Sequence, residues 1–184
     1  MSKFAKRLLV AAILLLVLAA ILHMGGWLQC AIFTIGAIAS VFEISNAFEK
    51  RDRKPYMLPA YLYAAGYFVL YRLFGGEAVW LLGIFMVMLA LMERIWNRTR
   101  TTEDAFFALV PLVYPLAFFT AVAMVAEYAG EYDKSRIALF SIFAMPLMGD
   151  TFAYTFGRLF GKRKLSPELS PNKTVAGGIG GVLG

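Results

Sequence analysis

The chain has 184 residues, of which 60% are hydrophobic and 16% are charged. A soluble domain is about 45–50% apolar and about 25% charged, so the composition excludes an ordinary soluble fold and indicates a protein of the lipid bilayer. The net charge of +6 lies in short segments between hydrophobic runs, without a basic face of interleaved aromatic residues, so nucleic-acid binding is not expected. The lone cysteine, Cys30, lies inside a hydrophobic run, which excludes a disulfide framework and predicts a small buried side chain.

The hydrophobic residues form six runs, each close to the roughly 20 residues that cross a bilayer as a helix. They predict an all-α, polytopic transmembrane helical bundle with six complete spans and the start of a seventh, the six lying at 8–22, 27–44, 56–73, 78–92, 105–126 and 137–156. The first run follows Lys3, Lys6 and Arg7, as in a cleaved signal peptide, but no small-x-small cleavage site follows it, so a membrane span is favoured. Pro111 and Pro115 predict a kink in the fifth span.

The basic residues lie mostly on one side of these spans. Fifteen of the 18 Lys and Arg residues fall on the side of the N-terminus, and Arg72, Lys134 and Arg136 fall on the other. Positively charged loops stay in the cytoplasm and are attracted to anionic lipids. We therefore expect a multi-pass protein of the cell inner (cytoplasmic) membrane, with the N-terminus and the 157–173 loop in the cytoplasm.

The organisation of the chain changes near position 146. We predict a region 1–145, with the first five membrane helices and the start of the sixth. A region 146–184 follows, with the end of the sixth helix, a basic cytoplasmic loop and a glycine-rich start of a seventh helix.

A carboxylate interrupts the hydrophobic run of the sixth span. Asp150 lies about two helical turns before the basic segment, and a charged group within a membrane helix costs a few kcal/mol. Tyr154 and Arg158 follow at intervals of four residues, so the three side chains share one helix face. The pattern indicates either a polar site or an Asp–Arg pair that stabilises helix packing.

The basic loop that follows holds two Ser-Pro turns and five Lys and Arg residues. Lys and Arg side chains bind phosphate groups, and segment 170–174 is typical of an entry to a helix whose N-terminus favours phosphate. A solvated juxtamembrane loop has the same composition. The order of the residues favours the first interpretation: it runs Asp150-Thr151-x-Ala153-Tyr154-x-x-Gly157-Arg158-x-Phe160-Gly161-Lys162, then Leu165, then Ser170-Pro171-x-Lys173-Thr174-x-x-Gly177-x-x-Gly180-Gly181.

This pattern resembles the phosphatidate cytidylyltransferase (CDP-diacylglycerol synthase) family, over about 35 residues. The resemblance implies a nucleotidyltransferase of phospholipid biosynthesis, with CTP and phosphatidic acid as substrates and Mg²⁺ or another divalent cation as cofactor. It implies catalytic roles for Asp150 and Lys173, with Asp150 also as a metal ligand. It further implies a set of substrate-binding residues, namely Tyr154, Arg158, Lys162, Ser170, Thr174 and Gly177.

The sequence departs from that family at several points. Gly149 stands where the family usually has Asn, and Ala176 stands where it commonly has Glu. The C-terminal signature of the family is absent. The last hydrophobic stretch, 174–184, is too short to cross a bilayer, and its glycine pairs are suited to tight helix contact. We therefore expect an N-terminal portion of a longer enzyme, inactive by itself.

Two other functions fit parts of the sequence. A CTP-dependent polyprenol or lipid kinase also joins a membrane lipid to a cytidine nucleotide, but it releases CDP and a lipid phosphate. A membrane transporter is less favoured, because its polar residues would lie near the bilayer midplane on repeated broken helices. The formation of a homodimer stays open.

Overall fold

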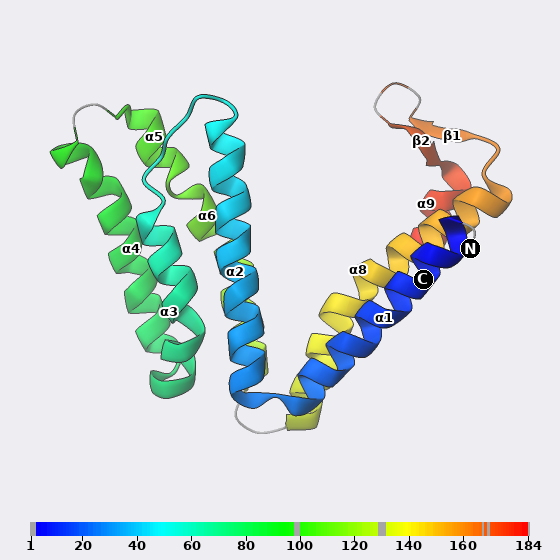
Figure 1. Cartoon of the computed structure of the whole chain (residues 1–184), viewed down its shortest axis with the longest axis horizontal. Coiled ribbons are helices and arrows are strands. Elements are labelled where there is room, and N and C mark those ends of the chain that lie inside the picture. Colours follow the sequence, from blue (N-terminus) through cyan, green and yellow to red (C-terminus); the bar gives the residue numbers. More distant parts are fainter. Residues whose placement is uncertain (1–2, 98–99, 129–131, 167, 169, 184) are drawn as a thin grey trace. The chain divides into compact units, whose positions relative to one another are not determined.

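The computed structural model describes residues 3–97, 100–128, 132–166, 168 and 170–183. The chain is almost entirely helical, with one short hairpin near its end (Figure 1). The elements are α1 (Lys3–Met24), α2 (Gly26–Glu49), α3 (Leu58–Phe74), α4 (Gly76–Trp96), α5 (Thr102–Phe107), α6 (Val110–Val113), α7 (Pro115–Ala126), α8 (Tyr132–Phe160), β1 (Lys164–Ser166), β2 (Ser170–Thr174) and α9 (Val175–Leu183).

The helices follow the predicted hydrophobic runs. Within the described residues, four helical segments are long and apolar enough to cross a membrane, namely Gly26–Glu49, Gly76–Trp96, Thr102–Ala126 and Asp133–Phe160. A shorter apolar helix covers Leu9–Met24, and α3, with 17 residues, coincides with the third run. The prediction of an all-α polytopic membrane protein is confirmed, and the count of six spans plus a seventh stays a prediction.

The predicted kink in the fifth span is confirmed. Three helices, α5, α6 and α7, replace one continuous helix, and a proline stands in the first turn of the second and of the third. Proline has no backbone N–H and its ring clashes with the preceding turn, so it begins a helix more readily than it continues one. Pro146, by contrast, lies inside the continuous helix α8.

The chain forms two compact units, one of residues Met24–Ser135 and one that combines Met1–His23 with Arg136–Gly184. In the first unit α3 packs against α2, α4 and α7. The buried positions include alanines with no exposed surface, and small residues let membrane helices approach closely; these alanines are Ala37, Ala60, Ala64, Ala90 and Ala123. Cys30 is buried and free, as predicted.

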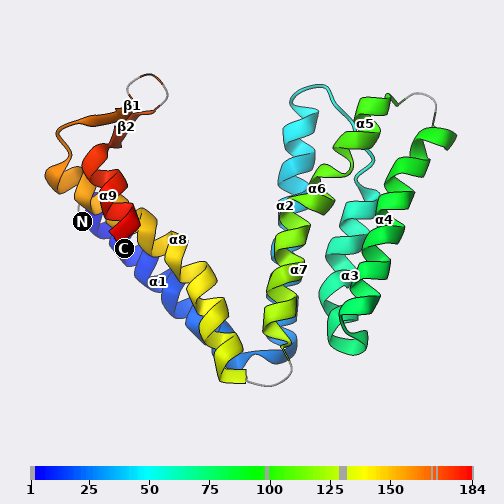
Figure 2. The ribbon, with the colours of Figure 1, turned by 180° about the vertical axis from the view of Figure 1, so that it is seen from behind.

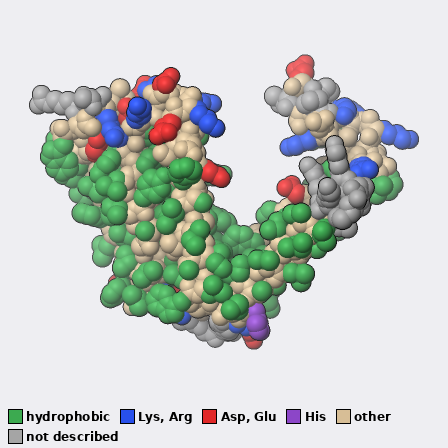
Figure 3. Space-filling view, viewed as in Figure 1, with side chains coloured by type: hydrophobic (Ala, Val, Ile, Leu, Met, Phe, Trp, Pro, Cys, Tyr) green, Lys and Arg blue, Asp and Glu red, His purple; other side chains and the backbone are tan. Residues whose placement is uncertain are grey.

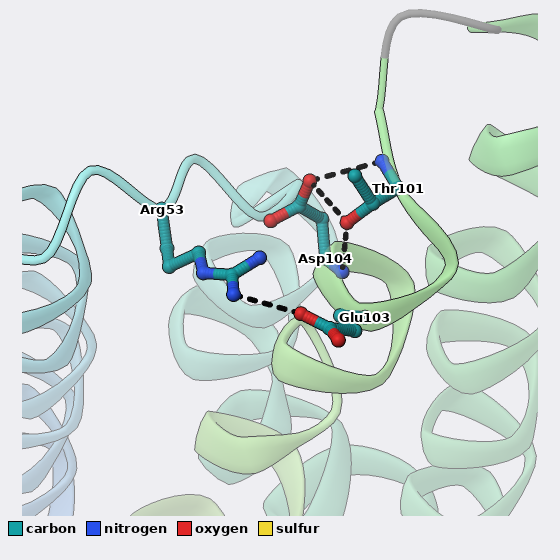
Figure 4. Close-up of polar contacts among 4 residues, drawn as sticks. All are labelled: Arg53, Thr101, Glu103 and Asp104. Atoms are coloured by element: carbon teal, nitrogen blue, oxygen red, sulfur yellow. Dashed lines mark hydrogen bonds and ion pairs between the residues drawn. The ribbon is translucent and has the colours of Figure 1, made fainter.

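Ion pairs hold together one end of this unit. Arg53, in the loop after α2, contacts Glu103 on α5 at 2.8 Å (Figure 4). Thr101 and Asp104 form a capping box at the start of α5: the Thr101 hydroxyl accepts from the Asp104 N–H at 3.2 Å, and the Asp104 carboxylate accepts from the Thr101 N–H at 3.0 Å. The loop after α2 and the start of α5 therefore lie on the same side of the bundle.

A further ion pair joins α3 to the end of α7. Arg72 Nη1 lies 2.7 Å from Glu127 Oε1, and the guanidinium also covers the Trp27 ring at 4.9 Å. Both charged side chains are about three-quarters buried, so this pair is screened less by solvent than an exposed pair. The space-filling view shows hydrophobic side chains along the helices and charged ones gathered at helix ends (Figure 3), as expected of helices surrounded by lipid.

The other unit consists of α1, α8, the hairpin and α9, and Figure 2 shows it from behind. Arg136, near the start of α8, donates through Nη2 to the backbone carbonyl of His23, near the end of α1. Figures 1 and 2 show the two helices side by side and antiparallel, so the N-terminal end of α1 lies toward the hairpin end of α8. The predicted division at residue 146 concerns function rather than packing, and it stays a prediction.

The basic segment after α8 differs from the predicted loop, because much of it forms an antiparallel hairpin. Lys164 pairs with Thr174 and Ser166 pairs with Ser170, with an irregularity between the two pairs. The hairpin continues directly into α9, and the Val175 N–H donates to the Arg163 carbonyl at 3.0 Å. Backbone pairing thus fixes the segment that composition alone describes as an irregular loop.

Candidate functional site: a charged cavity between α8, the hairpin and α9

A cavity of about 620 Å³ lies within the second unit, where α8, the hairpin and the start of α9 meet. Its size is within the range of small-molecule binding sites in proteins. The residues that line it are Asp150, Ala153, Tyr154, Gly157, Arg158, Leu165, Asn172, Lys173, Thr174, Gly177, Gly178 and Gly181.

Helix α8 contributes one polar face to the cavity. Asp150, Tyr154 and Arg158 all line it, as their spacing of four residues predicts. Two neighbouring hydroxyls are bonded within the helix instead: Thr151 donates to the Leu147 carbonyl at 2.8 Å, and Thr155 donates to the Thr151 carbonyl at 2.7 Å. Asp150 is exposed, so its carboxylate is accessible to a ligand in the cavity.

Strand β2 contributes the polar residues on the other side of the cavity. Asn172 and Lys173 are exposed and line the cavity next to Thr174. The Thr174 hydroxyl accepts a hydrogen bond from the Gly177 N–H at 3.1 Å, which is the usual contact of a residue that caps a helix N-terminus. The strand therefore delivers a cation directly before the first turn of α9, where the helix dipole also favours an anion.

Small residues bring α8 and α9 into backbone contact. A Cβ atom at Gly177 would lie 2.8 Å from the Ala153 carbonyl oxygen and 3.3 Å from the Gly157 Cα, and a Cβ at Gly181 would lie 3.2 Å from the Ala153 Cβ. The sequence predicted the contact stripe on α9. The matching stripe on α8, Gly149–Ala153–Gly157, was missed, although it has the same spacing of four residues.

The cavity contains most of the predicted site residues. Asp150, Tyr154, Arg158, Lys173, Thr174 and Gly177 line it. Lys162 and Ser170 are not among the lining residues of the described chain; Ser170 pairs with Ser166 at the start of β2. The roles of all eight in binding or catalysis stay predictions.

Asn172 lines the cavity and was not predicted. It occupies one of the variable positions of the motif, directly before Lys173 on β2. The feature that could have indicated it is its uncharged amide within a basic segment. An amide can both donate and accept hydrogen bonds.

The possible metal ligands that line the cavity fit a cation that is held partly by substrate. Among the described residues that line the cavity, Asp150 supplies the carboxylate. The described residues contain no group of three or more His, Cys, Asp and Glu side chains able to enclose a metal ion. Mg²⁺ keeps several waters and is commonly bound by one or two carboxylates together with substrate phosphates. Asp150 therefore fits a substrate-assisted Mg²⁺ site and does not fit a metal site built from this part of the chain alone.

The fold and the cavity together define an integral membrane protein with a cavity lined by charged residues at the end of a membrane helix. Residues 5–184 match the model of the cytidylyltransferase family, and the chain belongs to this family. The resemblance inferred from the sequence is confirmed.

Three curated relatives named phosphatidate cytidylyltransferase match part of the chain. Those of Staphylococcus haemolyticus and Staphylococcus epidermidis are 36% identical to it over 101 residues, and that of Staphylococcus aureus is 32% identical over the same length. Each match covers 54% of this chain and 36% of the relative, so the match spans about a third of the length of these relatives. No solved structure matches the chain.

Proposed function

We propose that this chain forms part of a phosphatidate cytidylyltransferase, a nucleotidyltransferase that converts CTP and phosphatidic acid to CDP-diacylglycerol and pyrophosphate. The observation that carries the proposal is the cavity in which Asp150, Arg158 and Lys173 meet. It supplies the two kinds of charge that the reaction needs, cations for phosphate groups and a carboxylate for a divalent metal. Membership of the cytidylyltransferase family supports the same reaction.

In this reaction a phosphate oxygen of phosphatidic acid attacks the α-phosphorus of CTP. A new P–O bond forms, the bond between the α- and β-phosphates breaks, and pyrophosphate leaves. Both reactants are anions, so the attack is slow unless their charge is neutralised. Arg158 binds phosphate through its planar guanidinium and Lys173 through a compact ammonium group, and both stabilise the charge that develops as pyrophosphate departs.

Asp150 would hold the divalent cation, together with substrate phosphates. A bound Mg²⁺ would supply Lewis-acid polarisation of the phosphoryl oxygens. The place of Asp150 on α8 would keep the cation on that side of the cavity. Tyr154, one turn further along, and Thr174, at the start of α9, complete the walls of the cavity.

We further propose that the cavity faces the cytoplasm, in the inner membrane, with the N-terminus on the same side. The antiparallel packing of α1 on α8 supports a common side for the N-terminus and the hairpin. The excess of Lys and Arg on that side supports the cytoplasmic assignment. CTP then enters from the cytoplasm, and phosphatidic acid keeps its acyl chains in the bilayer.

The test uses the product of the complete reading frame that contains this sequence, purified in detergent with phosphatidic acid, Mg²⁺ and CTP labelled at the α-phosphate. We expect a labelled lipid product and equimolar pyrophosphate, and much less product with ATP in place of CTP. CTP labelled at the γ-phosphate, offered with a polyprenol, is the counter-test. Transfer of that label to the lipid with release of CDP would identify a lipid kinase and contradict the proposal.

A further inference from the structure

The Thr174 side chain lies where three glycines leave space for it. A Cβ atom would lie 3.0 Å from Thr174 Oγ1 if added at Gly157, 2.7 Å if added at Gly161 and 3.1 Å if added at Gly177. A Cβ at Gly161 would also lie 2.8 Å from Thr174 Cγ2. Contacts this short are repulsive. At Gly157, Thr174 Oγ1 is the nearest atom, whereas at Gly161 and Gly177 the carbonyl oxygens of Gly157 and Ala153 lie nearer still. We call Gly157, Gly161 and Gly177 the glycine socket.

Hydrogen bonds fix the same residue from both directions along the chain. Its hydroxyl accepts from the Gly177 N–H at 3.1 Å, and its backbone pairs with Lys164 of β1. The next residue, Val175, donates its N–H to the Arg163 carbonyl at 3.0 Å. These bonds tie the end of β2 and the start of α9 to each other and to β1, and the approach of Thr174 to Gly157 brings them against the end of α8.

The cations of the cavity lie on either side of this anchor. Arg158 follows Gly157 on α8, and Lys173 precedes Thr174 on β2. Thr174 and Gly157 are in contact, and Lys173 and Arg158 are their respective neighbours in the sequence. A displacement of Thr174 from the socket would therefore move Lys173 relative to Arg158. Misplacement of a charged group by about 1 Å costs a large factor in binding or rate.

We propose that Thr174 is a positioning residue, which the glycine socket holds so that Lys173 and Arg158 face one bound phosphate group. The resemblance implied that Thr174 binds substrate, whereas this proposal gives it a role in placing its neighbours. The proposal rests on the proposed function only in taking the ligand to carry phosphate. The geometry of the socket does not depend on it.

The first test measures amide hydrogen exchange at Gly177 in the ligand-free protein in nanodiscs. The Thr174 hydroxyl protects this amide, so Thr174→Ser, which keeps the oxygen, should retain protection. Thr174→Ala and Thr174→Val should lose it by about tenfold or more, because neither has an acceptor. Loss of protection in Thr174→Ser, or retention of protection in Thr174→Val, would overturn the proposal.

The second test is a double-mutant cycle between Gly157→Ala and Thr174→Ala, with the dissociation constants of CTP and of pyrophosphate measured for each variant. A methyl group at 157 displaces Thr174, so we expect about tenfold weaker binding of both ligands. In the Thr174→Ala background the obstructing hydroxyl is gone, so the same methyl should cost less than about twofold. Non-additivity of this kind is the signature of residues in contact. Gly66→Ala, in the other unit, is the control, because its Cβ would meet no atom closer than 3.7 Å.

Three results would overturn the proposal. Additive losses of affinity would make Thr174 a direct ligand. A lower Tm with unchanged dissociation constants would make it a purely structural residue. Failure of the wild-type chain to bind either ligand would remove both this proposal and the proposed function. Binding of pyrophosphate but not CTP, with the expected coupling, would instead support the positioning role and contradict the proposed function.

Discussion

Asp150 is the carboxylate on which the proposed chemistry depends. We expect Asp150→Asn to reduce kcat by roughly 10²–10³, the effect of losing one electrostatic contact in a transition state. Asparagine keeps the volume and much of the hydrogen bonding but removes the charge that a cation needs. The measurement is turnover of the full gene product at saturating CTP and Mg²⁺, for variants of equal Tm.

Glu77→Gln is the matched control for this substitution. Glu77 is exposed in the first turn of α4, so loss of its charge should leave kcat within twofold. If Asp150→Asn turned over at nearly the wild-type rate, Asp150 would serve helix packing, which is the alternative that the sequence left open.

Lys173 should act mainly in binding. We expect Lys173→Ala to weaken CTP binding by roughly tenfold or more, since a hydrogen bond to a charged group contributes about 1.5–3 kcal/mol. Titration of CTP into the purified protein measures this directly. Lys164→Ala is the control: Lys164 lies on the same hairpin but is not among the lining residues. An equal loss in both variants would indicate a diffuse electrostatic effect instead of a specific contact.

The sequence predicted the α8 part of this site better than the hairpin part. Asp150, Tyr154 and Arg158 share a face because a helix repeats every 3.6 residues, and that periodicity is visible without a structure. The places of Asn172 and Thr174 depend on the register of a short hairpin and on contact with Gly157. Such contacts between distant segments leave no local period, so the sequence indicated a helix entry at 170–174 but not the approach of Thr174 to Gly157.

The close crossing of α8 and α9 depends on glycines, because a larger side chain at these positions would clash with the other helix. A Cβ at Gly180 would lie 2.5 Å from the Phe156 Cβ and 3.0 Å from the Phe152 carbonyl oxygen. We expect Gly180→Ala to lower stability by about 1–3 kcal/mol, which is typical of overpacking. The loss of stability is measured by thermal unfolding in detergent, with proteolytic cleavage of the chain near the hairpin as the readout.

Gly178→Ala provides the comparison on the same helix. Its Cβ would meet Leu165 Cδ1 at 4.0 Å, an ordinary contact, so stability should change little. Alanine has the higher helix propensity, so Gly178→Ala should if anything stabilise α9. Equal destabilisation by the two substitutions would mean that the close approach of Phe156 and Phe152 to Gly180 is not what determines the stability of this helix crossing.

Helices were predicted well because apolar length is a local property of the sequence. The hairpin was not, because segment 162–174 lacks the alternating pattern that indicates strands. Its pairing places Lys164 opposite Thr174 and is anchored by contacts with α8. The division of α5, α6 and α7 was foreseen at Pro111 and Pro115, where the missing N–H acts locally.

The orientation of the protein in the membrane is testable with single cysteines. We replace Cys30, which is buried, by serine and introduce cysteine either at Lys164 or at Tyr128. An impermeant thiol reagent applied to intact spheroplasts should label position 128 and leave position 164 unlabelled until the cells are opened. Labelling of position 164 from outside would reverse the proposed topology.

The discontinuity of the unit that carries the cavity has a consequence for biosynthesis. Its first segment, Met1–His23, emerges from the ribosome before Met24–Ser135, and its second segment only afterwards. At roughly 5–20 residues per second, translation of the intervening segment takes on the order of ten seconds. During that interval α1 exists without α8, and the backbone carbonyl of His23 lacks the hydrogen bond from Arg136. Synthesis of the first helix therefore precedes assembly of the cavity, and an early interruption of translation leaves a chain that has α1 but lacks the residues that line the cavity.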